Sequence, residues 1–116
     1  MQFTAKVITG KGRGKRLGFP TANLDKTDLK IKHGVYSVEA AISKKQYKGL
    51  LHFGPKKTFS EDVSLELFIK DFNFDIYGKN VKIEIIRKIR DVKKFADVEE
   101  LKKQIKKDLE KLNQEL

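Results

Sequence analysis

Apolar and polar residues alternate along most of the chain. At residues 3–9, Phe3, Ala5 and Val7 fall on one side of an extended segment, with polar side chains between them. A period of two residues is the pattern of a strand with one buried face. The same period returns later, so we expect further strands at residues 35–42, 47–53, 64–70 and 81–89.

The last segment follows a different period. Asp97 and Glu100 have the three-residue spacing of a capping box, which satisfies unpaired backbone N–H groups at the start of a helix. We therefore expect one amphipathic helix over residues 97–113, with its apolar stripe on the rest of the domain and its lysines toward water. The stripe comprises Val98, Leu101, Ile105, Leu109 and Leu112.

These elements fit a single domain over residues 1–116. A chain of 116 residues supports one hydrophobic core and is too short for two. We expect an all-β fold, a small antiparallel Greek-key β-barrel of about six strands within about residues 3–94, with the C-terminal helix packed on it. Closure of the sheet is favoured because it removes exposed strand edges.

Cysteine and histidine are scarce in this chain. There is no cysteine and there are two histidines, which excludes disulfides, thiolate metal sites and a histidine-rich metal centre. No apolar run approaches the ~20 residues that span a bilayer. The first residues also lack the apolar region of a signal peptide. We therefore expect a cytoplasmic protein that makes no membrane contact.

The formal net charge of the chain is +10. Such a charge attracts nucleic acid, anionic membranes or phosphorylated small molecules. The lysines are spread through every segment, a distribution that more often serves solubility than a specific partner. Charge alone therefore does not identify what the protein binds.

Residues 10–16 form a basic segment with glycine at alternate positions, Gly10, Gly12 and Gly14. Glycines let the backbone turn tightly and bring several N–H groups toward one anion. The spacing matches neither the dinucleotide-binding fingerprint nor the P-loop. From the residues alone, a phosphate-binding loop and a plain basic hairpin loop both stay open.

A proline, Pro20, follows that loop and precedes two oxygen-bearing side chains. In an extended segment Thr21 and Asn23 project to the same side. Neutral oxygen ligands suit a Mg²⁺ ion that keeps water molecules and shares its shell with phosphates. The same residue types are common in turns, so the pair by itself leaves that interpretation open.

The block Gly10–Leu24 reads Gly-Lys-Gly-Arg-Gly-Lys-Arg-Leu-Gly-Phe-Pro-Thr-Ala-Asn-Leu. It resembles the signature of the riboflavin kinase family. The resemblance spans essentially the whole chain, and this first block is its most specific part. Later pieces resemble the family in the same order, at Gly34-Val35-Tyr36, Leu65-Glu66-Leu67, Ile76-Tyr77-Gly78-Lys79, Ile89-Arg90-Asp91 and Glu99-Glu100-Leu101.

The resemblance implies an enzyme that transfers the γ-phosphate of ATP to the ribityl 5'-hydroxyl of riboflavin and gives FMN. It implies that Thr21 and Asn23 ligate Mg²⁺ and that Glu66 is the general base. The position of Glu66 in a strand, between Leu65 and Leu67, supports this role because partial desolvation suits a general base. Without the resemblance, an ordinary solvent-facing glutamate is the favoured interpretation.

The resemblance also implies contacts to both substrates. Arg90 and Phe19 are the implied flavin contacts, with phosphate for Arg90 and nucleotide for Phe19 as the alternative ligands. A surface arginine at a strand end and a plain core aromatic are the competing interpretations. The residues implied to hold the ATP phosphates are Gly12, Arg13, Gly14 and Lys15.

The chain departs from the family pattern at several positions. Phe68 stands where the family often has histidine, and His52 heads a His-Phe-Gly segment where Asn-Ile-Gly is common. Val92 replaces the glutamate of an Arg-x-Glu segment. These changes bear on flavin affinity more than on the type of reaction. We expect His33 and His52 to be loop and strand residues without a catalytic duty.

Two rival functions follow from the same features. A nucleic-acid-binding β-barrel fits the charge and the basic loop, although we rank nucleic acid below small-molecule substrates. A flavin-binding module without turnover fits the departures. Bacterial relatives often join this kinase domain to a domain that makes FAD, so we expect an FAD synthetase domain elsewhere in the native chain or as a separate protein.

Overall fold

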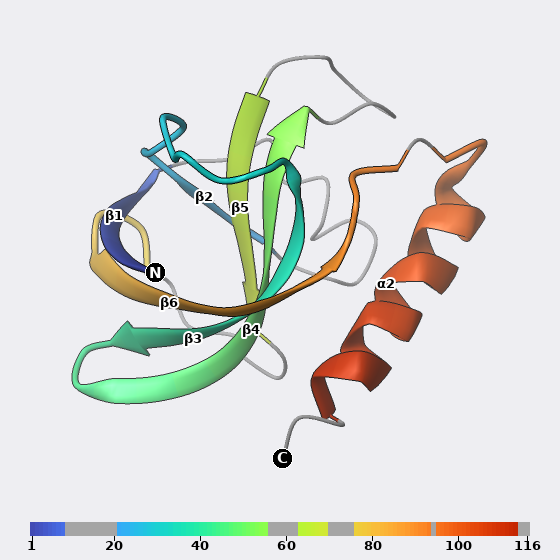
Figure 1. Cartoon of the computed structure of the whole chain (residues 1–116). Coiled ribbons are helices and arrows are strands. Elements are labelled where there is room, and N and C mark those ends of the chain that lie inside the picture. Colours follow the sequence, from blue (N-terminus) through green and yellow to red (C-terminus); the bar gives the residue numbers. More distant parts are fainter. Residues whose placement is uncertain (9–20, 56–62, 70–75, 94, 114–116) are drawn as a thin grey trace.

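The computed structural model describes residues 1–8, 21–55, 63–69, 76–93 and 95–113. Within these ranges the chain forms six strands followed by one helix (Figure 1). The elements are β1 (Gln2–Ile8), β2 (Ala22–Leu24), β3 (Gly34–Ile42), β4 (Lys45–Pro55), β5 (Val63–Ile69), β6 (Asn80–Arg90) and α2 (Val98–Asn113).

The six strands close into an antiparallel barrel in the order β1-β2-β5-β4-β3-β6. Strands β3, β4 and β5 are successive neighbours, and β6 lies on the far side of β3, which is Greek-key connectivity. The all-β barrel with a C-terminal helix predicted from the sequence is therefore confirmed. Every described strand has a neighbour on both sides, so its backbone N–H and C=O groups meet partners within the sheet.

The shortest strand, β2, joins the two halves of the barrel. It pairs with β1 through Val7 and Leu24, and with β5 through Ala22 and Leu67. The next residue, Asp25, fixes this junction because its carboxylate accepts a hydrogen bond from the Lys6 backbone N–H at 2.8 Å and its own N–H donates to the Lys6 carbonyl at 3.0 Å. The sequence indicated only an extended stretch here.

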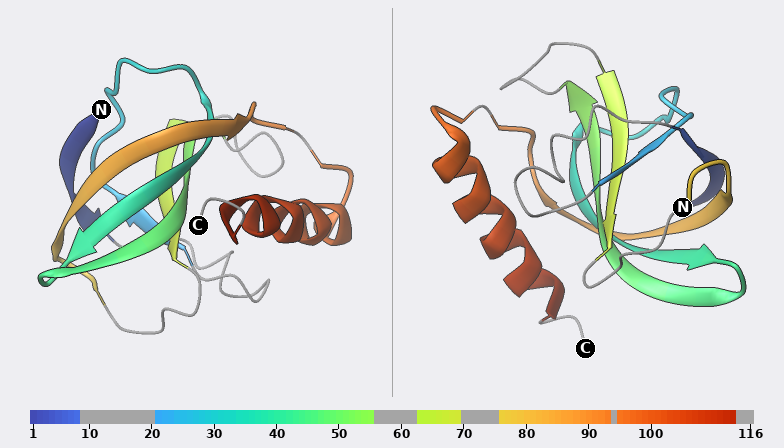
Figure 2. Two further views of the ribbon diagram at one scale, coloured as in Figure 1. Left: turned by 60° about the horizontal axis from the view of Figure 1, so that its bottom comes forward. Right: turned by 180° about the vertical axis from the view of Figure 1, so that it is seen from behind.

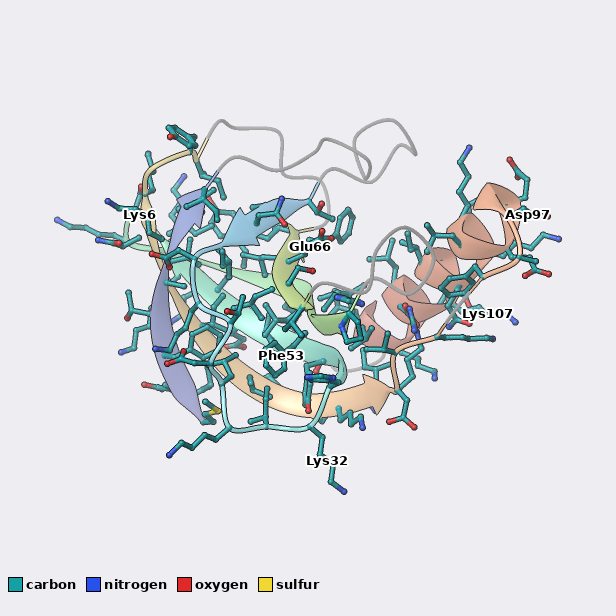
Figure 3. All side chains as sticks on the ribbon, turned by 90° about the horizontal axis from the view of Figure 1, so that it is seen from above. Lys6, Lys32, Phe53, Glu66, Asp97 and Lys107 are labelled. Carbon is teal, nitrogen blue, oxygen red and sulfur yellow. The ribbon has the colours of Figure 1, made fainter. Side chains whose placement is uncertain are left out.

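Side chains that point into the barrel form its core. Phe3, Ala5 and Val7 are buried, as their alternation predicted. Phe53 lies inside the barrel (Figure 3), and Leu51 beside it on the same strand is also fully buried. Burying such a side chain stabilises the folded state by about 1.5–3 kcal/mol relative to leaving it in water. The core also contains Leu24, Tyr36, Val38, Ala40, Ile42, Leu65, Leu67, Ile69, Val81 and Ile83.

The hairpin between β3 and β4 is tighter than predicted. The sequence indicated a connection of residues 43–46, whereas strand pairing continues to Ile42 and Lys45. Ser43 and Lys44 make the turn with φ angles of 50° and 70°. Positive φ at both central residues is the type I′ geometry, whose twist matches that of the two strands.

Helix α2 packs on the outside of the barrel, against β4 (Figures 1 and 2). Leu109 and Leu112 meet an apolar patch on the outer face of the sheet that includes Val35, Leu50 and Phe68. This confirms the predicted apolar stripe at its C-terminal half.

The N-terminal cap of α2 is present in a shifted form. The Glu100 backbone N–H donates to Asp97 Oδ1 at 2.9 Å, as a capping box requires. The Glu100 carboxylate accepts from the Ala96 backbone N–H at 3.1 Å, one residue earlier than the usual arrangement. Both bonds fix where the chain turns into the helix.

A buried ion pair ties the helix to the end of β6. Arg90 donates to both carboxylate oxygens of Asp108, with distances of 2.9–3.1 Å, and Gln104 adds a bond of 3.0 Å to the same carboxylate. The side chains of Arg90 and Asp108 are 16% and 2% exposed. Because charges in such surroundings are costly when unpaired, the helix is held in one position relative to β6.

In the part of the chain that the structure describes, no helix is long and apolar enough to cross a membrane.

Removing the Asp108 carboxylate is expected to loosen the helix. Asp108→Ala leaves Arg90 partly buried without its counter-ion, so we predict a loss of about 3 kcal/mol in the free energy of unfolding, measured by urea denaturation. Asp91→Ala is the matched control because its side chain lies 85% exposed beside Lys88, and it should leave the urea midpoint unchanged. Equal midpoints for the two variants would show that the Arg90–Asp108 pair does not hold the helix.

Candidate active site

One row of side chains crosses the outer face of the barrel. Asn23 on β2 is the partner of Glu66 on β5, and Glu66 is the partner of His52 on β4. His52 in turn faces Val35 on β3, which faces Arg90 on β6. Directly opposed residues of neighbouring strands point to the same side, with Cβ atoms about 4.5–5.5 Å apart. The register therefore brings together polar residues that are far apart in the sequence.

Glu66 lies near the middle of this row. Its neighbours in the strand, Leu65 and Leu67, point inward and are fully buried, which directs Glu66 to the outer face (Figure 3). Glu66 itself is half-buried. Phe68, two residues on, packs with the apolar patch beneath α2. A carboxylate held by a strand that is paired on both sides has a defined position, which a general base needs.

Asn23 stands beside Glu66 at the β2 end of the row, and Thr21 precedes β2 in the chain. Asn23 is half-buried, whereas Thr21, two residues earlier, is exposed. Within the described ranges, no three histidine, aspartate or glutamate side chains cluster in a way that would hold a metal ion. The hydroxyl and amide oxygens of Thr21 and Asn23 fit a Mg²⁺ ion that takes its other ligands from water and phosphate.

Arg90 has a structural partner at the other end of the row. Besides its bonds to Asp108, its guanidinium donates to the Asp91 carbonyl at 3.1 Å and lies 5.8 Å from the centre of the Phe95 ring. Gly34 is required beside it, because a Cβ atom there would lie 2.8 Å from the Arg90 carbonyl oxygen. The predicted flavin contact of Arg90 stays a prediction, and its role in holding the helix was not foreseen.

The half-buried Lys88 and the exposed Asp91 form an ion pair next to Arg90. Their hydrogen bond raises the pKa of the Lys88 ammonium and lowers the pKa of the Asp91 carboxyl. Both groups are therefore charged near neutral pH, and they add one positive and one negative charge at the end of β6.

Several predicted site residues lie outside the residues that the structure describes. These are Gly12, Arg13, Gly14, Lys15 and Phe19. Their predicted contacts to phosphate and flavin stay predictions.

Sequence reasoning did not reveal the partners of two polar residues, His52 in the row and Asp108 on α2. His52 was interpreted as a strand residue without a role, because its cross-strand partner is not visible in the sequence. Asp108 had a local signal, since it continues the helical spacing of Leu101 and Ile105 toward Leu112 and so lies on the apolar stripe. A lone acidic residue on that stripe indicates a buried partner.

The sequence matches the riboflavin kinase family over residues 1–116. The chain belongs to this family. The resemblance inferred from the glycine-rich block and the later strand motifs is therefore confirmed, and the row through Glu66 is a surface of a riboflavin kinase domain.

Individual relatives agree with this assignment. An RNA-binding riboflavin kinase, RibR, of Bacillus subtilis (strain 168) is 41% identical over 105 residues, which cover 89% of this chain and 46% of the relative. A bifunctional riboflavin kinase/FMN adenylyltransferase of the same organism is also 41% identical, over 88% of this chain and 34% of its own length. The chain thus spans less than half the length of these two relatives.

A solved structure shows the same architecture. The crystal structure of a macrolide-efflux protein from Streptococcus pneumoniae superimposes with a TM-score of 0.84 at 38% identity, over 94% of this chain and 37% of that one. The likeness again concerns one domain of a longer protein.

Proposed function

We propose that this domain is a riboflavin kinase that transfers the γ-phosphate of ATP to the ribityl 5'-hydroxyl of riboflavin and yields FMN and ADP. The observation that supports this most directly is the cross-strand pairing of Glu66 with Asn23 in a chain of the riboflavin kinase family. It sets a proton acceptor beside an oxygen ligand for the metal that accompanies ATP.

Glu66 is the proposed general base. Its carboxylate takes the proton of the ribityl hydroxyl as that oxygen forms a bond to the γ-phosphorus, while the bond from the γ-phosphorus to the bridging oxygen of ADP breaks. Phosphoryl transfer depends mainly on positioning and charge neutralisation. The half-buried position of Glu66 on a doubly paired strand supplies the positioning.

Thr21 and Asn23 are the proposed magnesium ligands. The ion, when bound with ATP, neutralises charge on the phosphate oxygens. Because Asn23 faces Glu66 across one strand pair, oxygens from this chain would approach the reacting phosphate from the β2 side of the row.

Phosphate and flavin contacts complete the proposed site. The glycine-rich segment containing Gly12, Arg13, Gly14 and Lys15 leads along the chain into Thr21, so its backbone N–H groups are proposed to hold the phosphates. Arg90 and Phe19 are the proposed flavin contacts. The engagement of Arg90 by Asp108 means that this contact depends on where the helix sits.

The wider protein is proposed to act in FAD synthesis as well. One relative is a riboflavin kinase/FMN adenylyltransferase of which this chain covers 34%. We propose that an FAD synthetase activity acts together with this domain, either within a longer native chain or as a separate protein. The absence of cysteine from the sequence suits a reducing compartment, and the cytoplasm is the proposed location.

RNA binding is a second candidate function. It is favoured by the relative RibR, an RNA-binding riboflavin kinase, together with the net charge of +10. RNA affinity held by lysines falls steeply with salt, whereas flavin binding through apolar contacts does not. Quenching of riboflavin fluorescence and RNA binding, each measured at low and high salt, separate the two functions.

Incubation with riboflavin and MgATP should yield FMN, measured by chromatography. Glu66→Gln should lower kcat by about 10²-fold or more while ATP still binds, since the amide cannot accept the proton. Glu39→Gln is the matched control, a half-buried strand glutamate on β3 at a different part of the barrel, and should retain wild-type turnover. Near-normal turnover by Glu66→Gln would remove this residue from the role of base.

Asn23→Ala should change the magnesium requirement. Loss of one oxygen ligand is expected to raise the Mg²⁺ concentration for half-maximal rate by about tenfold or more, measured at saturating ATP and riboflavin. Asn80→Ala, at the exposed start of β6, serves as the control and should leave the requirement unchanged. If both variants need the same Mg²⁺ concentration as wild type, Asn23 is not a metal ligand.

A further inference from the structure

His52 occupies a fixed position directly beside Glu66. It lies on β4, and its cross-strand partners are Glu66 on β5 and Val35 on β3. The Nδ1 atom of His52 is buried, and the residue as a whole is half-buried. The Nδ1 edge of the imidazole is therefore packed among its neighbours on the outer face.

The chemistry of the two cross-strand partners differs. Val35 is apolar and belongs to the patch under α2, together with Leu50. Glu66 presents a carboxylate, which accepts hydrogen bonds. A neutral imidazole always carries one N–H donor, and a protonated one carries two. At a Cβ separation of about 4.5–5.5 Å, the side chains of directly opposed residues reach one another.

We propose that His52 is a positioning residue for the general base, and that its imidazole N–H donates to the neighbouring Glu66 carboxylate and fixes its direction. This inference rests on the proposed function of Glu66. Glu66 then stands between Asn23 on β2, the proposed metal ligand, and His52 on β4, the proposed hydrogen-bond donor. A base held on a rigid strand by a neighbouring donor needs no rearrangement when the substrate hydroxyl arrives.

The backbone around His52 suits this duty. Strand β4 lies between β3 and β5, with paired residues on both sides of His52. Phe53, the next residue, is buried in the core. Because adjacent side chains of a strand point to opposite faces, this burial keeps His52 on the outer face. From β4, the His52 side chain reaches the Glu66 carboxylate by extending across the sheet toward β5.

Two substitutions of His52 separate hydrogen bonding from packing. His52→Leu keeps bulk but removes the N–H donor, and His52→Asn keeps a donor. We expect His52→Leu to lower kcat by about tenfold or more with KM for ATP within about twofold, because the base is misplaced while nucleotide binding is not. His52→Asn should restore most of the rate. Equal rates for wild type and His52→Leu would overturn the proposal.

A double-mutant cycle tests whether His52 acts through Glu66. In the Glu66→Gln background, His52→Leu should change the residual kcat by less than about twofold, because the group it positions has gone. If instead the two losses multiply, His52 acts independently of the base and the proposal fails. His33→Asn is the control, because His33 packs on the Phe53 ring at 5.2 Å and carries no assigned duty.

A spectroscopic test of the contact does not depend on activity. The chain has two histidines, so their imidazole NMR signals are readily distinguished with single variants. Glu66→Gln should shift the signals of His52 and leave those of His33 in place. Unchanged His52 signals would overturn the contact even in an active kinase. If the His52 signals respond but wild type forms no FMN, the proposed function fails and the positioning role fails with it, while the contact itself stands.

Discussion

The register that closes the barrel decides what this protein presents to its substrates. Because side chains of a strand alternate between two faces, the pairing that buries Leu65 and Leu67 also directs Glu66 outward. The same pairing sets Asn23 on one side of Glu66 and His52 on the other. A slip of one residue in β5 would bury the carboxylate and expose core leucines, so the stability of the core and the geometry of the site depend on one arrangement.

The helix extends this arrangement to the far end of the row. Strand β6 runs across the barrel and leads toward α2 (Figure 1). Asp108 on this helix accepts hydrogen bonds from Arg90 at the end of β6. Gly34 lets the backbone of Arg90 approach β3 closely. Along the sequence the glycine-rich segment precedes β2, and the β6 end of the row is set by the helix. The proposed magnesium ligand Asn23 and the proposed flavin contact Arg90 therefore lie at opposite ends of the row.

Much of this could be predicted from the sequence, and the rest could not for physical reasons. The alternation of apolar and polar residues around Phe3 and Leu65 predicted the strands, because successive side chains of a strand point alternately into the core and away from it. The pairing of His52 with Glu66 is a long-range property of the closed sheet and leaves no local pattern. Strand β2 has three residues, too few to show a period. Asp108 was overlooked because a helical pattern treats a charged residue as solvent-facing.

The most direct measurement is a crystal structure of the domain with FMN and MgADP bound. We predict that the Glu66 carboxylate lies within about 2.6–3.2 Å of the ribityl oxygen that carries the phosphate, the distance that proton transfer requires. The side-chain oxygen of Asn23 should coordinate the Mg²⁺ ion, on the side of the phosphate away from Glu66. A ribityl chain bound elsewhere on the barrel, with Glu66 remote from its terminal oxygen, would contradict the proposed site.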